Sequence, residues 1–250
     1  MFGVTDRIYT FSKKFKKYRD IEVDWKPEIS LSDKYNRDWY CFVPQNTVRF
    51  SIFRNGLIPN CGNVFIYKIY SLNIIDNNPT RTLENLQIIY NDVSERLYNS
   101  FKEKKDISFL GVSLGNVLAV RAAGEVGSKI ERIVSIAGGG KLGLSAWEGI
   151  LTSNIAKSSG FRSPEEYEEI LSSFSPVHYI NKILAKEILI RLGARDLLIP
   201  FNHGQELASA FRDQASRTEA KYDCKIYPGS DHSATIFLSA LFKVTERRLR

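Results

Sequence analysis

The sequence predicts an α/β protein whose one core is built around a buried sheet. At 250 residues the chain has the length of one large α/β domain, and nothing in its composition demands a second. Short apolar stretches alternate with stretches in which apolar residues recur at helical spacing. Residues 107–124, ISFLGVSLGNVLAVRAAG, join one stretch of each kind through a sharp turn at Gly111 and Gly115, and we expect this unit to be the centre of a domain spanning residues 1–250.

The amino-terminal part of the chain predicts few regular elements. Residues 1–38 show no sustained period, and only an amphipathic turn is expected there, near Phe11, Phe15 and Tyr18. Residues 39–53 hold two segments rich in aromatic and branched side chains, WYCFV and VRFSIF, on either side of Pro44-Gln45-Asn46; this pattern predicts an antiparallel hairpin at a sheet edge. Residues 63–71 are almost continuously apolar and predict a strand nearer the centre.

A long helix is predicted to lead into the central unit. Asn78-Pro79 marks its start, because proline is tolerated in the first helical turn, and apolar residues at helical spacing continue to about Lys104. After the central strand and helix, residues 130–137 predict another strand. Three consecutive glycines, 138–140, mark a loop at its carboxyl end.

Residues 141–184 depart from the alternation and are predicted to be a helical insertion that covers the site as a lid. Helical stretches are expected at 147–155 and 164–174, the second with Ser163 as its N-cap and Glu166 three residues later. The alternation then resumes with a strand at 188–192, a helix at about 202–215, a strand at 224–227 and a final helix from about Ser233.

The composition is that of an ordinary soluble globular protein, with 43% hydrophobic and 25% charged residues. No apolar run approaches the ~20 residues that span a bilayer, so no integral membrane segment is predicted. The first residues lack the apolar core and cleavage site of a secretory signal, and we expect a cytoplasmic protein. Cys41, Cys61 and Cys224 suit neither a disulfide framework nor a C-x-x-C metal site, so we expect reduced cysteines.

The net charge of +7 is concentrated at the two ends of the chain. The residues responsible are Lys13, Lys14, Lys16, Lys17 and Arg19 at one end, and Arg247, Arg248 and Arg250 at the other. Because no recognition motif accompanies them, solvated ends explain the charge and no nucleic-acid partner is predicted. Binding of nucleic acid or an anionic membrane through the basic amino terminus remains an alternative, and it predicts steep salt dependence.

Ser113 is the candidate nucleophile. The two glycines of G-V-S-L-G allow the chain to reverse between strand and helix, which lifts the serine hydroxyl above the sheet. A serine needs a base to take its proton. Of the three histidines, His232 follows a predicted strand and precedes a helix, so its imidazole can reach over the carboxyl edge of a parallel sheet. His178 and His203 lack that placement and are interpreted as packing or capping residues.

Asp196 is the candidate acid that orients the base. It follows a buried strand in GARDLLIP, where the apolar neighbours leave little other reason for a carboxylate. Asp231 is the nearest rival, but a residue adjacent to the base is poorly placed to bond its Nδ1, and turn capping is its expected role. We therefore expect Asp196 to lie within hydrogen-bond reach of His232. The order of the candidates is Ser, Asp, His.

With these residues in place, the sequence resembles the α/β-hydrolase family over roughly residues 60–245. GVSLG is similar to the family's elbow, GARDLLIP to its acid loop, SPVHYI to the return from the lid, and GSDH to its histidine loop. The resemblance implies a mostly parallel sheet flanked by helices, a helical lid and acyl-enzyme chemistry without a cofactor. It also implies an oxyanion hole formed by the N–H of Leu114 and a second N–H from Tyr70 or Ser71, where members usually carry His-Gly or Gly-Gly.

The leading hypothesis is a serine hydrolase that acts on a small-molecule carboxylic ester or thioester through a catalytic Ser113, Asp196 and His232. The same residues would serve an acyltransferase if an alcohol or amine replaced water. A non-catalytic binding protein that retains the fold is the alternative from another class, suggested by the residues at the second oxyanion position.

Overall fold

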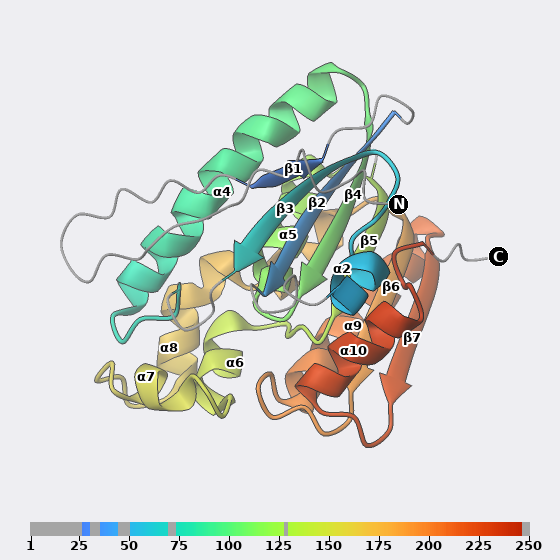
Figure 1. The fold of residues 1–250 in the computed structure, drawn as a ribbon. Helices are drawn as coiled ribbons and strands as arrows, with labels where there is room; N and C mark the ends of the chain where they lie inside the picture. The colour runs from blue at the N-terminus through green and yellow to red at the C-terminus, as the bar shows by residue number, and fades with distance from the viewer. Residues whose placement is uncertain (1–26, 31–35, 45–50, 70–73, 128–129, 247–250) are drawn as a thin grey trace.

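The computed structural model describes residues 27–30, 36–44, 51–69, 74–127 and 130–246. Within them, seven strands form one sheet in the order β1-β3-β2-β4-β5-β6-β7 (Figure 1). The strands are β1 (Glu28–Ser30), β2 (Arg37–Pro44), β3 (Asn63–Ile69), β4 (Asp106–Val112), β5 (Ile130–Ile136), β6 (Ala185–Gly193) and β7 (Lys221–Tyr227). All neighbours are parallel except β1 and β3, which are antiparallel. The sheet is therefore mostly parallel, as predicted.

The central strands are apolar because helices cover both faces of the sheet. Phe109 of β4 lies between Tyr40 of β2 and Ile133 of β5, and all three are completely buried. One face packs against α4 (Pro79–Lys102), α5 (Gly115–Val126) and α9 (Phe201–Thr218). The other packs against α2 (Ser51–Leu57) and α10 (His232–Leu241), as Figure 1 shows.

The predicted antiparallel hairpin at residues 39–53 is wrong. Its first segment is β2, which pairs in parallel with β3 and β4 inside the sheet. Its second segment runs into the helix α2, which packs against α10; a Cβ on Gly56 would lie 2.1 Å from the carbonyl oxygen of Ala240. Aromatic and branched residues suit a buried helix as well as a strand, so a short apolar run did not distinguish the two.

The other elements predicted on described residues are present with shifted ends, apart from the single helix expected at 147–155. The helix after Asn78 is α4, and the Asn78 side chain accepts a hydrogen bond from the N–H of Thr80 at 3.0 Å. Strands β6 and β7 begin three residues earlier than predicted, because charged residues lie among their first three positions (Lys186 and Glu187 in β6, Lys221 and Asp223 in β7) and leave no apolar run. The turn expected near Phe11, Phe15 and Tyr18 lies outside the described residues.

Residues 141–184 lie between β5 and β6, and we call them the inserted segment after the insertion predicted there. It contains α6 (Leu142–Glu148), α7 (Ser153–Lys157), α8 (Pro164–Leu171) and three short 3-10 turns (Ser172–Phe174, Pro176–His178, Ile180–Lys182). Ser163 caps α8 by accepting from the N–H of Glu166 at 3.2 Å, as predicted. The stretch predicted as one helix at 147–155 is two, because Gly149 adopts an extended conformation beside the backbone of Leu198.

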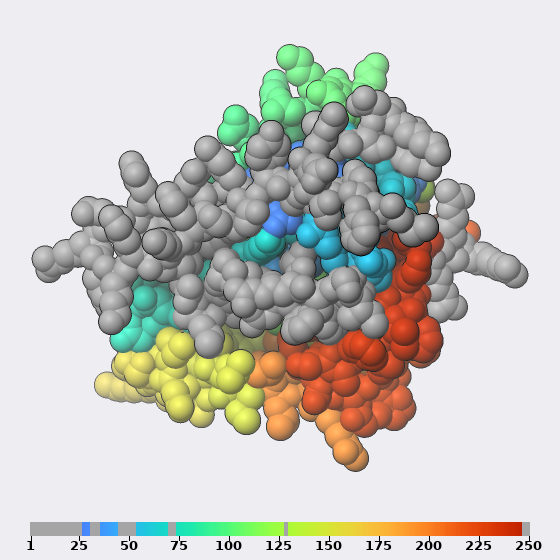
Figure 2. All heavy atoms as spheres, in the orientation of Figure 1, coloured from blue at the N-terminus to red at the C-terminus, as the bar shows by residue number. Residues whose placement is uncertain are grey.

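The helices α6, α7 and α8 of the inserted segment lie beyond the carboxyl ends of the central strands (Figure 1). Figure 2 shows it in yellow on the same side of the molecule as the red carboxyl-terminal segment. Among the helices that the structure describes, none combines the length and the apolarity needed to cross a bilayer.

Candidate active site

Ser113 lies at the turn between β4 and α5 in a left-handed backbone conformation, with φ of +57°. Such a conformation costs a non-glycine residue about 1–2 kcal/mol. The turn is tight: a Cβ on Gly111 would lie 2.7 Å from Cα of Asn116, and one on Gly115 would lie 2.3 Å from the carbonyl oxygen of Phe42. The glycines are thus required by close approach on both sides of the serine.

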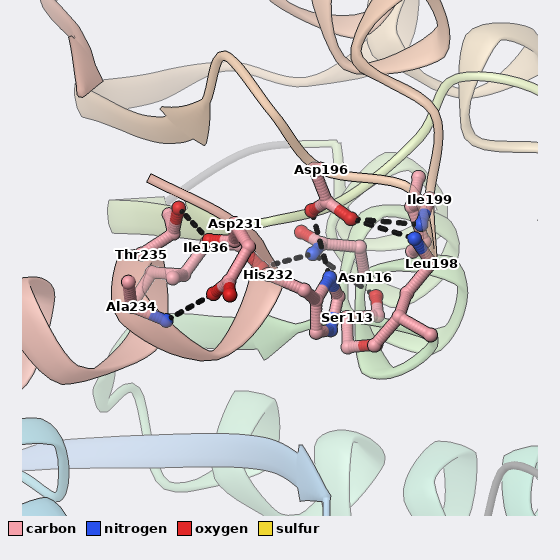
Figure 3. Close-up of polar contacts among 10 residues, drawn as sticks. All are labelled: Ser113, Asn116, Ile136, Asp196, Leu198, Ile199, Asp231, His232, Ala234 and Thr235. Carbon is pink, nitrogen blue, oxygen red and sulfur yellow. Dashed lines mark hydrogen bonds and ion pairs between the residues drawn. The ribbon is translucent and has the colours of Figure 1, made fainter. Parts of the chain in front are cut away.

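Asp196 and His232 meet at the carboxyl edge of the sheet, from the loops that follow β6 and β7. Nδ1 of His232 lies 2.7 Å from Oδ2 of Asp196, so the contact predicted from their strand-end positions is present (Figure 3). Because an ionised carboxylate only accepts, Nδ1 is the donor. Both side chains are buried, which shields the bond from water.

The other carboxylate oxygen of Asp196 holds its own loop in shape. Oδ1 accepts hydrogen bonds from the N–H groups of Leu198 and Ile199, each at 3.0 Å. With one oxygen bonded to backbone and the other to imidazole, the carboxylate has a fixed orientation. A buried acid is thus fully hydrogen-bonded, as burial of such a group requires.

Backbone contacts join the acid loop to the histidine loop. The N–H of Ala194 donates to the carbonyl of Tyr227 at 3.2 Å, and the N–H of Arg195 donates to that of Ser230 at 2.9 Å. Gly193 permits this approach, since a Cβ there would lie 2.2 Å from Oγ1 of Thr235. The two loops therefore form one supported unit.

Ser113 and His232 line the same cavity, which has a volume of about 310 Å³. Figure 3 shows the imidazole of His232 with Asp196 on one side and Ser113 on the other. The wall is mostly apolar, with Ile75, Leu142, Ala146, Leu151, Leu198 and Ile236 among its residues. A concave apolar site beside a few convergent polar groups is the usual form of a small-molecule site.

The cavity also holds polar residues that the sequence did not single out. Lys141 and Ser145 line it from the inserted segment, and Lys141 pairs with Glu206 at 2.8 Å. Hydrogen bonding to Glu206 raises the pKa of Lys141, so this ammonium stays charged. Helical spacing indicates which residues of the inserted segment are apolar, but it does not indicate which of them face a cavity.

Of the two predicted oxyanion donors, one lies at the cavity and the other falls outside the described residues. The N–H of Leu114 donates no hydrogen bond to any other described residue, and Leu114 lines the cavity beside Ser113. The second predicted oxyanion donor, Tyr70 or Ser71, falls outside the part of the chain that the structure describes.

Asp231 has the capping role expected of it, and the other two histidines lie away from Ser113. Asp231 caps α10 by accepting from the N–H of Ala234 at 2.8 Å. Nε2 of His203 lies 2.9 Å from Oε2 of Glu148, which links α9 to α6, and His178 is exposed. The structure brings none of these three residues to Ser113.

The cysteines are free thiols, and Cys41 lies inside the sheet, where burial raises its pKa. Within the described ranges, no group of three or more histidine, cysteine, aspartate or glutamate side chains is arranged to hold a metal ion.

The chain matches no protein-family model and no curated protein sequence. Solved structures do match it. An acylaminoacyl peptidase from Pyrococcus horikoshii has a TM-score of 0.60 at 14% identity, covering 88% of this chain and 37% of its own length.

Two similar structures are matched over most of their own length. TT1662 from Thermus thermophilus has a TM-score of 0.57 at 11% identity, with 87% of this chain and 91% of that chain covered. The Pyrococcus furiosus esterase Pf2001 has a TM-score of 0.53 at 15% identity, with 88% and 84% covered. This chain thus spans less than two fifths of the peptidase, and at these identities the likeness is one of fold.

Proposed function

Because this chain has the α/β-hydrolase fold, we propose that it is a serine hydrolase that cleaves a carboxylic ester or thioester through Ser113, His232 and Asp196. One observation carries the proposal: a buried Asp196–His232 hydrogen bond of 2.7 Å beside a serine on a left-handed turn, at one cavity. The similar solved structures, which include a peptidase and an esterase, support a hydrolase at this coarse level.

In the proposed mechanism His232 is the general base. Its Nδ1 is bonded to Asp196, so Nε2 is the nitrogen that takes the proton of the Ser113 hydroxyl. The serine oxygen then attacks the acyl carbon, and the carboxylate of Asp196 stabilises the imidazolium that results. Two backbone N–H groups also donate to this carboxylate and hold it in the orientation that the imidazolium needs.

The N–H of Leu114 supplies one donor for the oxyanion of the tetrahedral intermediate, because Leu114 follows Ser113, is the N-cap residue of α5 and lines the cavity. His232 then gives its proton to the leaving group, and an acyl-enzyme forms on Ser113. Water then attacks the acyl-enzyme, with His232 taking a proton from the water and later giving it to the Ser113 oxygen. This releases the carboxylic acid and restores the serine.

The cavity indicates an apolar acyl group of moderate size. Its volume of about 310 Å³ lies at the lower end of the range for ligand pockets, roughly 300–1,000 Å³. Leu142, Ser145 and Leu151 contribute to the wall from the inserted segment, so we propose that residues 141–184 act as a lid that sets this limit.

The test is covalent labelling of the intact protein with a fluorophosphonate, read by mass spectrometry, together with hydrolysis of p-nitrophenyl esters of graded acyl length. We expect one adduct on Ser113 that is absent from Ser113→Ala. Turnover in that variant should fall by 10⁴-fold or more, since loss of a triad nucleophile costs ~10⁴ to 10⁶ in kcat. Folded protein that forms no Ser113 adduct would favour the non-catalytic alternative.

A further inference from the structure

Asn116, in the first turn of α5, follows Ser113 by three residues and has only 1% of its surface exposed. Its side-chain Nδ2 donates to two carbonyl oxygens, that of Ser113 and that of Ile136, each at 3.2 Å (Figure 3). Asn116 does not line the cavity. Its side chain is therefore directed into the protein, toward the junction between β4 and β5, and away from any substrate.

The two carbonyl groups belong to a strained part of the backbone. Ser113 has φ of +57°, and Ala137, which follows Ile136, has φ of +49°. A positive φ is unfavourable for any residue other than glycine. Such a backbone conformation persists only where the surrounding structure holds it in place. The N–H of Ser113 also donates to the Ile136 carbonyl, at 2.9 Å. This one oxygen therefore accepts hydrogen bonds from both the Ser113 backbone and the Asn116 side chain.

Two glycines make the space for the Asn116 side chain. A Cβ on Gly138 would lie 2.2 Å from Nδ2 of Asn116 and 2.4 Å from its Cγ. A Cβ on Gly111 would lie 2.7 Å from the Cα of Asn116 and 2.8 Å from its Oδ1. The amide thus fills a slot that exists because both neighbours lack a side chain.

The helix alone does not supply the link across to β5. The backbone N–H of Asn116 donates to the Ser113 carbonyl at 3.0 Å, a bond that any residue at this position would make. The side-chain bond to Ile136 connects α5 to a different strand, and the residue must carry an N–H donor at the right length to make it.

We propose that Asn116 is a positioning residue that holds the Ser113 backbone against the end of β5, so that the serine hydroxyl keeps its place beside His232. This inference rests on the proposed role of Ser113 as nucleophile. Since misplacement of a reacting atom by about 1 Å can cost ~10²-fold in rate, loss of this link affects the chemical step more than substrate binding.

The test compares fluorophosphonate labelling rates of the wild type, Asn116→Ala and Asn116→Asp. An ionised aspartate has the shape of asparagine but donates no hydrogen bond. We expect both variants to be labelled about 10- to 100-fold more slowly, and kcat for a p-nitrophenyl ester to fall with KM changed less than threefold. The matched control is Gln214→Glu. Gln214 is another buried amide, and its Nε2 donates to the backbone carbonyl of Ile183 at 2.8 Å, far from Ser113. This variant should be labelled at the wild-type rate.

Gly138→Ala gives a second, independent route to the same defect, because its Cβ displaces the Asn116 amide without altering Asn116 itself. We expect its labelling to slow like that of Asn116→Ala, and the double variant to label no more slowly than either single one, since both act on one contact. Wild-type labelling rates in folded Asn116→Asp and Gly138→Ala would overturn the proposal.

A crystal structure of Asn116→Asp separates this inference from the proposed function. If the wild type itself is not labelled, the proposed function fails, and the structure decides the role of Asn116 alone. Ser113 displaced from its left-handed conformation supports the positioning role; Ser113 unchanged, with φ near +57°, overturns it.

Discussion

Asp196 accepts one hydrogen bond from His232 and two from backbone N–H groups, so its replacement tests orientation apart from packing. In Asp196→Asn the amide oxygen still accepts from the backbone, while the amide N–H₂ faces Nδ1 and favours the wrong imidazole tautomer. We expect kcat to fall by up to ~10⁴ with little loss of stability. Ester hydrolysis and urea unfolding measure the two effects.

Asp231→Asn is the matched control, because this neighbouring carboxylate caps α10 and does not contact the imidazole ring. Asparagine is an equally good cap, so both kcat and stability should change little. If Asp196→Asn kept kcat within tenfold of the wild type, another carboxylate would have to orient the base.

Alanine variants of the three histidines are expected to differ in ester-hydrolysis activity. His232→Ala removes the base and should abolish turnover. His203→Ala removes a contact to Glu148, and His178→Ala changes an exposed side chain, so each should retain most of the activity. Equal losses in all three variants would contradict the choice of His232.

Residues at strand ends could be predicted from the sequence, whereas the residue that holds the turn could not. Ser113, Asp196 and His232 each come after a parallel strand, and such strand ends meet at one edge of the sheet, so their meeting was predictable. Asn116 could not be predicted, because its side chain donates to carbonyls three and 20 positions away. No local sequence pattern indicates the second of these contacts, to Ile136.

At the scale of elements, Glu168 connects two helices of the inserted segment. Its Oε2 accepts from the N–H groups of Gly143 and Leu144 at the start of α6, and its Oε1 accepts from Oγ of Ser175. Glu168→Gln removes the charge and one acceptor, so we expect a loss of about 1 kcal/mol in the free energy of unfolding. Since α6 lines the cavity, KM should rise most for the longest acyl chains.

Glu169→Gln is the control for that prediction. Glu169 is the next residue on α8 and is exposed, so the variant carries the same change of charge without the contact to α6. Urea unfolding and ester kinetics should match the wild type. Equal behaviour of the two variants would mean that Glu168 does not support α6.

The misread hairpin shows where element prediction failed. Residues 37–44 form a strand with parallel neighbours on both edges and helices over both faces, so its side chains carry no alternation of apolar and polar residues. The helix α2 has only seven residues, too few for a 3.6-residue period to emerge. In contrast, the 24 residues of α4 repeat the period several times, and that helix was predicted almost to its ends.

At the scale of the whole molecule, the thiol of Cys41 reports on global opening. It lies within β2 with no exposed surface, and burial raises its pKa, so little thiolate forms and no reagent reaches it in the folded protein. We expect Cys61 and Cys224, both partly exposed, to react with a thiol reagent well before Cys41. Peptide mapping by mass spectrometry after timed alkylation measures the order. Reaction of Cys41 as fast as Cys61 would mean that the sheet opens locally.

The global architecture was predictable because many weak signals in the sequence agree. Alternation of strands and helices, the turn at Ser113 and the order Ser, Asp, His each favoured one arrangement, and the mostly parallel sheet is present. The cavity could not be predicted, since its shape depends on side chains from α5, α6, α10 and the acid loop together. Volume is a property of packing between distant segments, and periodicity records only the local chain.

The backbone bonds that join the loops after β6 and β7 have a consequence for folding kinetics. Asp196 and His232 are 36 positions apart, and Ser113 reaches them only across the ladder from β4 through β5 to β6. Contacts between distant positions close large loops and form late compared with helices. We therefore expect the site to assemble only after β4, β5, β6 and β7 have paired. On the proposed function, labelling at Ser113 would then count the molecules that have completed this pairing.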